Sequence, residues 1–262
     1  MGSTKRTLPL LRPVVGRASR EVLQIAHRGG SAGAENYEPG HLVRIAALGA
    51  HLVEIDVRAT GDGHLVVHHD PTIVVDSRTV RIDATSMRDL TAIASGRVHP
   101  AASVIRAVQR AGLGAYVDIK DMPGSAVPRL IELLTMETMI DSVILASVDV
   151  ATVARCAAAA PDVPRAVLFR SLDTDPVDLA RAADADFLHP CWEHDARPDR
   201  LLAGPWLDNV RRHGLGVVCW HEERPDVLNA LLALGVDGIC TDDPALLAAL
   251  AAGDQLPAPR DR

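Results

Sequence analysis

Three observations predict that the chain folds as an α/β protein of the TIM (β/α)8 barrel type, with an extra β-hairpin arm after the second barrel strand. Short apolar segments alternate with helical segments along the 262 residues, which is typical of a parallel α/β architecture. Eight strand segments remain when the hairpin arm is set aside, and about 250 residues suit a closed barrel of that size. No glycine-rich dinucleotide fingerprint follows any strand, which disfavours the alternative of a doubly wound open sheet.

The predicted barrel strands are short and rich in Val, Ile, Leu and Ala. They lie at residues 22–26, 51–58, 115–120, 142–146, 165–169, 187–189, 217–220 and 238–241. Helices are predicted at residues 39–48, 86–90, 103–111, 126–137, 150–160, 176–183, 206–213, 225–234 and 244–251, several with proline in the first turn or glycine after the last. Residues 71–102 otherwise have a less regular pattern. We expect a flexible polar leader at 1–20, one barrel domain over 21–253, and a polar tail at 254–262.

The stretch from Ala50 to Pro71 carries the first signs of chemistry. Glu54 and Asp56 are two residues apart on the strand at 51–58, so the alternation of a strand puts both carboxylates on one face. Like charges on a buried face repel each other and lose hydration, so they require a cation nearby.

A hairpin then returns toward these carboxylates. Asp62-Gly63 is a strong turn signal, and it folds residues 65–69 back along the strand at 51–58. His69 is thereby delivered beside the two carboxylates, whereas alternation turns His68 to the opposite face.

Functional residues of a TIM barrel lie at the carboxyl ends of its strands. The polar residues at these ends are His27, Arg28, Glu54, Asp56, His69, Asp118, Lys120, Ser147, His189, Trp220, His221 and Asp242. Taken singly, each has a structural interpretation; Asp242, for example, is expected to cap the helix that begins near Pro244. The functional interpretation depends on three neighbouring strands supplying the set together.

Several residues of this set together predict a type of reaction. Glu54, Asp56 and Asp118 offer hard oxygen ligands, which suit Mg²⁺ or Ca²⁺ better than zinc. Arg28 and Lys120 add positive charge that favours an anion, and phosphate fits best. Two histidines from separate strands allow one to remove a proton and the other to donate one. The combination is typical of metal-assisted phosphodiester cleavage.

Composition excludes several other classes. The formal charge is −7, and neither a basic run nor an aromatic platform is present, so nucleic acid is not the expected partner. No apolar stretch is long enough for a secretory signal or a membrane span, so we expect a cytoplasmic protein without stable membrane insertion. The four cysteines lack CxxC spacing and are expected to be free buried thiols. The expected partner is a small-molecule phosphodiester, and no oligomeric state is predicted.

The same segments resemble the glycerophosphodiester phosphodiesterase family, whose fold is a TIM barrel. The matching segments are His27-Arg28-Gly29, Glu35-Asn36, Glu54-Ile55-Asp56-Val57, the hairpin from Thr60 to Asp70, Asp118-Ile119-Lys120, and the stretch from Gly235 to Asp242. The similarity runs from about residue 24 to residue 250 and is more specific in the first half. It implies hydrolysis of glycerophosphodiesters to glycerol 3-phosphate and an alcohol, in which the glycerol 2-hydroxyl attacks the phosphorus first.

The resemblance also implies a role for each site residue. These are an acid–base pair, His27 and His69; metal ligands for Mg²⁺ or Ca²⁺, Glu54, Asp56 and Asp118; phosphate-binding residues, Arg28 and Lys120; and substrate-facing residues, Glu35 and Trp220.

Three departures from the family pattern keep alternatives open. The third metal ligand is usually Glu, whereas Asp118 resembles the sphingomyelinase D-type phospholipases. The segment at 37–40 replaces the usual Thr, and His-Glu-Glu at 221–223 replaces Thr-Val-Asn. One alternative is therefore a lyase that releases a cyclic phosphate, and another is a barrel that binds phosphodiesters without turning them over.

Overall fold

Eight parallel strands close into a barrel in the computed structural model of the chain, which describes residues 22–30, 35–94 and 96–253. The barrel strands are β1 (Leu23–Ala26), β2 (Leu52–Ala59), β7 (Gly114–Ile119), β8 (Val143–Ser147), β9 (Arg165–Phe169), β10 (Phe187–Pro190), β11 (Gly216–Cys219) and β12 (Gly238–Thr241). Because β1 pairs in parallel with both β12 and β2, the ring is complete. The predicted TIM barrel is confirmed, while the predicted leader at 1–20 and the tail at 254–262 lie outside the described residues.

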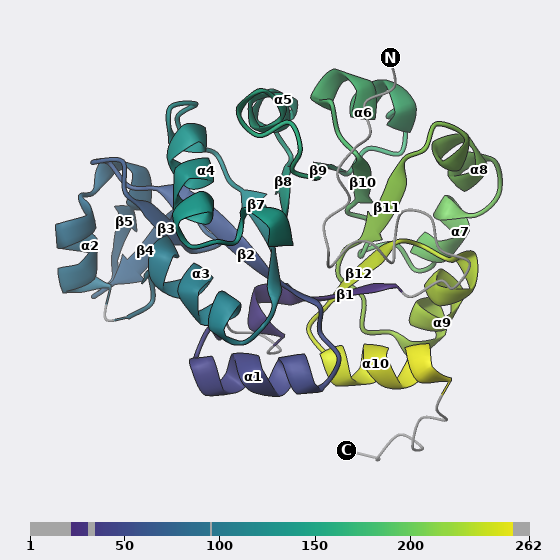
Figure 1. Cartoon of the computed structure of the whole chain (residues 1–262), viewed down its shortest axis with the longest axis horizontal. Coiled ribbons are helices and arrows are strands. Elements are labelled where there is room, and N and C mark those ends of the chain that lie inside the picture. The colour runs from purple at the N-terminus through teal and green to yellow at the C-terminus, as the bar shows by residue number, and fades with distance from the viewer. Residues whose placement is uncertain (1–21, 31–34, 95, 254–262) are drawn as a thin grey trace.

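Helices surround this ring of strands (Figure 1). They are α1 (Pro39–Ala47), α3 (Ala101–Arg110), α4 (Ala126–Met136), α5 (Val150–Ala159), α6 (Pro176–Ala183), α7 (Pro198–Leu202), α8 (Pro205–Arg212), α9 (Pro225–Leu234) and α10 (Pro244–Ala252). Proline occupies the first turn of α1, α6, α8, α9 and α10, where its missing N–H leaves no helical bond unmade. The short α7 was not predicted. A membrane-spanning helix is absent from the part of the chain that the structure describes.

The hairpin arm extends into a small lobe beside the barrel (Figure 1). Strand β3 (Leu65–Val67) runs antiparallel to β2, as predicted, and β6 (His99–Pro100) pairs with β3. The lobe adds β4 (Thr72–Val75), β5 (Arg78–Arg81), the short helix η2 (Ile82–Ala84) and α2 (Met87–Ile93). Its own apolar cluster includes Val66, Ile73, Ile82 and Leu90. In this region the sequence predicted only a helix at 86–90, which corresponds to α2.

The unpredicted hairpin of this lobe has an unusual turn. Asp76 and Ser77 join β4 to β5, and both have positive φ angles, 47° and 62°. Two consecutive positive φ angles are typical of a type I′ turn, which Asn-Gly normally signals. Because Asp-Ser is a weak signal for such a turn, the hairpin could not be predicted from these two residues.

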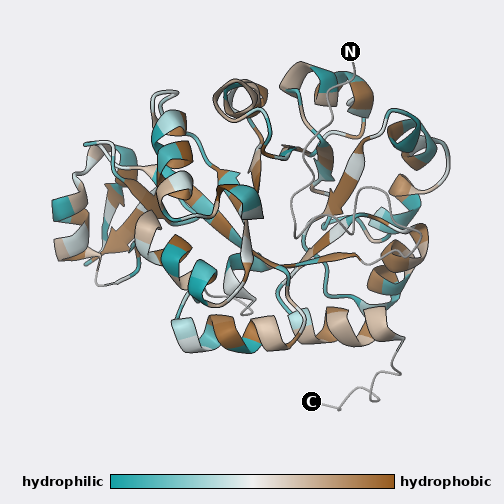
Figure 2. Cartoon of the chain, viewed as in Figure 1, coloured by the Kyte–Doolittle hydropathy of each residue, from teal (hydrophilic) through white to brown (hydrophobic). Residues whose placement is uncertain are grey.

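Alternation along the barrel strands separates the apolar core from the site. On β2, Val53, Ile55 and Val57 pack in the layer between strands and helices, while Glu54 and Asp56 face the barrel interior with no exposed surface. In Figure 2 the strands are largely hydrophobic, whereas the helices mix hydrophobic and hydrophilic residues. All four cysteines are free and buried, as expected.

Candidate active site

The predicted metal ligands form one buried group of carboxylates. In the register of β2 against β7, Asp56 lies beside Asp118, and Glu54 is two residues before Asp56. Glu54, Asp56 and Asp118 are at most 1% exposed, and one oxygen from each lies within 4.8 Å of the others. Glu54 Oε1 accepts no hydrogen bond from any described residue. An unpartnered buried oxygen among three hard donors fits a divalent cation.

Two cations already lie against part of this group. Lys120 Nζ is 2.8 Å from Asp56 Oδ1 and 2.5 Å from Asp118 Oδ2. Arg28 Nε is 3.1 Å from Asp56 Oδ2. Burial alone would raise the pKa of Asp56, but Lys120 and Arg28 lower it overall. Asp56 therefore remains ionised between two cations.

The negative charge of Glu54 is balanced less well by nearby cations and hydrogen bonds than the charges of Asp56 and Asp118. Its Oε2 accepts the backbone N–H of Arg28 at 3.0 Å. Burial, followed by the charges of Asp56 and Asp118, raises the pKa of Glu54 well above its usual value. Burial likewise raises the pKa of Asp118, although Lys120 opposes it. A bound cation would relieve both penalties.

A strained turn after β1 orients Arg28 toward these carboxylates. Arg28 has φ 47° and Gly29 has φ 90°, and a Cβ built on Gly29 would lie 2.1 Å from the carbonyl oxygen of Asn36. Only glycine fits so close to another backbone segment. The turn thus depends on Gly29. It directs the backbone N–H of Arg28 toward Glu54 and the side chain of Arg28 toward Asp56.

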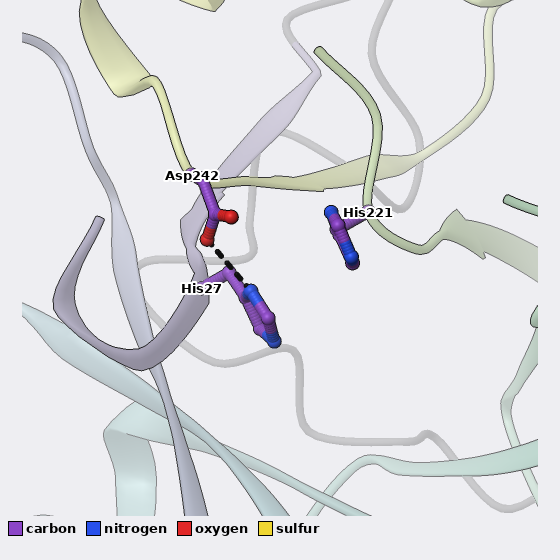
Figure 3. A group of neighbouring side chains, drawn as sticks. All are labelled: His27, His221 and Asp242. Carbon is purple, nitrogen blue, oxygen red and sulfur yellow. Dashed lines mark hydrogen bonds and ion pairs between the residues drawn. The ribbon is translucent and has the colours of Figure 1, made fainter. Parts of the chain in front are cut away.

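His27 is held by Asp242, a contact that was not predicted (Figure 3). His27 Nδ1 donates to Asp242 Oδ1 at 2.7 Å, and His27 Nε2 lies 4.0 Å from Glu54 Oε2. Burial alone would raise the pKa of Asp242, but the hydrogen bond from His27 lowers it overall. A carboxylate on Nδ1 fixes the ring and leaves Nε2 available for proton transfer.

The predicted role of Asp242 as a helix cap is wrong. Asp243 caps α10 instead, since its side chain accepts the N–H of Leu246 at 2.9 Å. The pairing of β1 with β12 explains the contact between His27 and Asp242. Ala26 on β1 lies beside Thr241 on β12, so the residues that follow them in the chain are neighbours.

A second histidine lies against His27 (Figure 3). The rings of His221 and His27 are stacked, with centroids 4.8 Å apart and planes 11° from parallel. His221 Nδ1 is 3.2 Å from Glu223 Oε2, and Glu223 Oε1 also accepts the backbone N–H of Asp242 at 2.9 Å. The hydrogen bond to Glu223 raises the pKa of His221.

His69 enters the site from the hairpin arm. Its backbone N–H donates to Glu35 Oε1 at 3.0 Å, and its Nδ1 is 2.8 Å from Asp70 Oδ1. The Arg58 side chain donates to the carbonyl oxygen of His69 at 2.6 and 3.0 Å. The side chain is 40% exposed, so His69 is accessible to solvent and substrate.

His68 also lines the cavity, so the predicted opposite facing of His68 and His69 is wrong. Strand β3 ends at Val67, and strict alternation does not continue beyond the last strand residue. His68 Nδ1 is 4.0 Å from Glu35 Oε1.

A cavity of about 800 Å³ opens over these groups. Its lining includes His27, Arg28, Glu35, His68, His69, Asp118, Lys120, Trp220, His221 and Asp242. Trp220 forms part of the wall. Its ring centroid lies 5.2 Å from the ring centroid of His27 and 5.9 Å from Lys120 Nζ. The cavity therefore joins the carboxylate group to both predicted acid–base histidines.

Two strand-end residues of the predicted set have structural contacts instead. Ser147 donates to the carbonyl oxygen of Ile119 at 2.6 Å. His189 is fully buried, and its Nδ1 accepts from the Tyr116 hydroxyl at 2.5 Å. Burial, with His27 and Lys120 nearby, lowers the pKa of His189 to about 3, so this ring is neutral.

Known proteins share both the sequence pattern and the fold. The model of the glycerophosphoryl diester phosphodiesterase family matches residues 27–246. A glycerophosphodiester phosphodiesterase from Caldanaerobacter subterraneus subsp. tengcongensis is 25% identical over 245 residues, covering 87% of this chain and 96% of the relative.

Solved structures show the same barrel. An Oleispira antarctica phosphodiesterase, in complex with the product sn-glycerol-3-phosphate, has a TM-score of 0.75 at 18% identity, covering 88% of this chain and 97% of that one. A glycerophosphodiester phosphodiesterase from Thermotoga maritima has a TM-score of 0.69 at 19% identity, covering 88% and 99%. The family match spans most of the chain and includes every segment of the cavity described above. The chain therefore belongs to the glycerophosphoryl diester phosphodiesterase family.

Proposed function

We propose that this protein is a metal-dependent phosphodiesterase that hydrolyses glycerophosphodiesters to glycerol 3-phosphate and an alcohol. The observation that carries the proposal is that a buried carboxylate group and a carboxylate-bound histidine lie side by side at the cavity. The buried group of Glu54, Asp56 and Asp118 lies beside His27, whose Nε2 is 4.0 Å from Glu54 and whose Nδ1 is bonded to Asp242. Family membership supports the same reaction class, and the Oleispira antarctica relative was solved with sn-glycerol-3-phosphate.

Glu54, Asp56 and Asp118 would hold Mg²⁺ or Ca²⁺ through carboxylate oxygens. When bound, such an ion neutralises charge on the phosphoryl oxygens and so favours attack on phosphorus. Arg28 and Lys120 line the same cavity and each has hydrogen-bond donors beyond those facing Asp56 and Asp118. These donors would bind and orient the phosphate.

The two histidines divide the proton transfers. His27 Nε2 would take the proton from the glycerol 2-hydroxyl as its oxygen forms the new bond to phosphorus, because Asp242 stabilises the resulting imidazolium. His69 would give a proton to the alcohol oxygen as the original P–O bond breaks. Water then opens the cyclic diester with these roles reversed, which yields glycerol 3-phosphate and restores both histidines.

A lyase that stops at the cyclic phosphate is the second candidate, because of Asp118. This side chain is one methylene shorter than the glutamate usual in the family, and Lys120 binds it at 2.5 Å. A ligand drawn back toward β7 changes the space left for the second water. Hydrolysis is favoured because the hairpin arm, Glu35 and both histidines follow the pattern of the glycerophosphodiesterases.

The proposal is tested with a panel of glycerophosphodiesters and an enzymatic assay for glycerol 3-phosphate. We expect turnover with Mg²⁺ or Ca²⁺, loss of turnover after chelation, and recovery when the ion is returned. Full activity in excess chelator, after elemental analysis verifies metal removal, would contradict metal dependence. Absence of turnover for every diester with every divalent ion would contradict the enzymatic function itself.

A further inference from the structure

The site contains a carboxylate-bound histidine that the proposed hydrolysis does not use. His221 follows Trp220 after β11, lines the cavity, and is bonded through Nδ1 to Glu223. It is the counterpart of His27, which is bonded through Nδ1 to Asp242. The two carboxylates are linked, because the backbone N–H of Asp242 donates to Glu223.

The two histidine rings lie face to face at the cavity, as Figure 3 shows. His27 Nε2 lies 4.0 Å from Glu54 Oε2. His221 lines the same cavity as Arg28, Asp118 and Lys120, and because Glu223 occupies its Nδ1, Nε2 is the nitrogen left for a ligand.

A metal ion shared by these residues is not what the stacking favours. His27, His221 and Asp242 have ligand atoms within 4.8 Å of one another. The lone pairs of an imidazole lie in the plane of its ring, however, and two planes 11° from parallel do not direct them at one point. The arrangement instead suits a protonated His221 ring stacked on the ring of His27.

The surroundings of His221 favour its protonated form. Charged and titratable groups face it from several elements: Glu223 on its own loop, Asp242 after β12, Glu193 after β10 and His27 after β1. Three of these are carboxylates, and the hydrogen bond to Glu223 raises the pKa of His221 although partial burial opposes it. An imidazolium held at Nδ1 retains one N–H donor, at Nε2.

We infer that His221, held by Glu223 against the face of His27, is an additional phosphate-binding residue that donates from Nε2 to the phosphoryl group. The inference rests on the proposed function, because it assigns this residue to the same substrate site. The residues concerned, His221 and Glu223, belong to the loop that follows β11.

The donor should act on binding more than on the chemical step. A charge-assisted hydrogen bond contributes enough to change affinity by about 10- to 100-fold. The effect should be largest on the monoester product, which carries more negative charge than the diester. Loss of the His221 donor leaves His27 and His69 in place, so kcat, the rate at which bound substrate reacts, should change only a few-fold.

The test measures glycerol 3-phosphate binding to the Ca²⁺-loaded protein by calorimetry across pH. His221→Thr removes the ring and its Nε2 donor, and His213→Thr makes the same change at an exposed position after α8. We expect His221→Thr to weaken binding about 10- to 100-fold and to raise KM for glycerophosphocholine with little change in kcat. His213→Thr should bind as the wild type does.

The pH profile separates binding from a merely structural role. Because protonated His221 is the donor, its contribution is present below its pKa and disappears as pH rises through it. Glu223→Gln keeps an acceptor for the N–H of Asp242 but removes the negative charge that favours protonated His221. The fall in glycerol 3-phosphate affinity that accompanies loss of this proton, here called the pH step, should therefore move to lower pH. In His221→Thr the step should be absent.

Wild-type affinity and an unchanged pH step in His221→Thr would overturn the inference. If that variant does not fold, an unmoved step in Glu223→Gln would overturn it equally. A wild type that binds glycerol 3-phosphate but turns over no diester would contradict the proposed function, while the binding comparison still tests His221.

Discussion

Replacing Glu54 by glutamine separates metal binding from folding. The side chain is fully buried, and one of its oxygens lacks a hydrogen-bond partner among the described residues. Glutamine keeps an oxygen for the backbone N–H of Arg28, and its NH₂ group can donate to a neighbouring carboxylate. Glu54→Gln therefore removes an uncompensated buried charge without leaving a cavity. We expect the metal-free variant to be more stable than the metal-free wild type.

The magnitudes follow from charge burial and mass action. Removing an unsatisfied buried polar group is worth about 1–3 kcal/mol, which raises Tm by at least about 2 °C for a chain of this length. In the wild type, a divalent ion at about 100 times its Kd adds about 2.7 kcal/mol, or about 5–10 °C. The variant should show little of this second shift.

The stability difference also has a defined pH dependence. Because the pKa of Glu54 is raised in the folded protein, the folded state binds this proton more tightly than the unfolded state. The wild type therefore loses no stability from Glu54 below the ordinary glutamate pKa near 4.5, and loses more as pH rises above it. The advantage of Glu54→Gln should grow over the same range.

Thermal unfolding followed by circular dichroism measures these shifts, with and without Mg²⁺ or Ca²⁺. Glu132→Gln provides the matched control, because it makes the same change on the exposed side of α4. The control should behave as the wild type does in both conditions. A metal-free Glu54→Gln that is clearly less stable than the wild type, or that retains the full metal-induced shift, would refute this reasoning.

Three further predictions concern the other site residues. Asp242→Asn should lower kcat by about 10²- to 10⁴-fold with Tm nearly unchanged, because the amide no longer stabilises protonated His27; steady-state kinetics within ten-fold of the wild type would contradict the dyad. His69→Gln should lose about 10²- to 10⁴-fold in rate, whereas His68→Gln, assayed in parallel, should lose far less, because the His68 side chain lies against Glu35 and is only 18% exposed compared with 40% for His69; equal losses would show that both act in the reaction. Lys120→Met should destabilise the metal-free protein by about 3–5 kcal/mol in urea unfolding, because it leaves buried Asp118 without a cation and Asp56 with Arg28 alone, and added Ca²⁺ should restore part of that loss; an unchanged midpoint would contradict the pairing.

The sequence was sufficient for the barrel because periodicity is a local property. Each barrel strand is a short apolar run, and the alternation at 53–57 correctly placed Glu54 and Asp56 toward the interior. The turn at Asp62-Gly63 likewise fixed the pairing of β3 with β2. These signals involve residues close together in the chain, so they require no knowledge of tertiary contacts.

The contacts that the sequence did not reveal depend on distant segments. Asp242 meets His27 across 215 residues of chain, through the closure of β12 onto β1. Its neighbour Asp243 fits the same local capping pattern, and local reasoning could not choose between the two. The stacking of His221 on His27 also brings separate strand ends together, so it became visible only in the closed barrel.

A phosphorus NMR time course of the metal-loaded protein with glycerophosphocholine tests directly whether the protein hydrolyses a glycerophosphodiester. Monoester, cyclic diester and unreacted substrate have separate signals, so one experiment follows all three. We expect the diester signal to be replaced by glycerol 3-phosphate, with choline released and with any cyclic intermediate consumed. A cyclic phosphate that accumulates and is not opened would contradict hydrolysis, and an unchanged diester signal would contradict catalysis on this substrate.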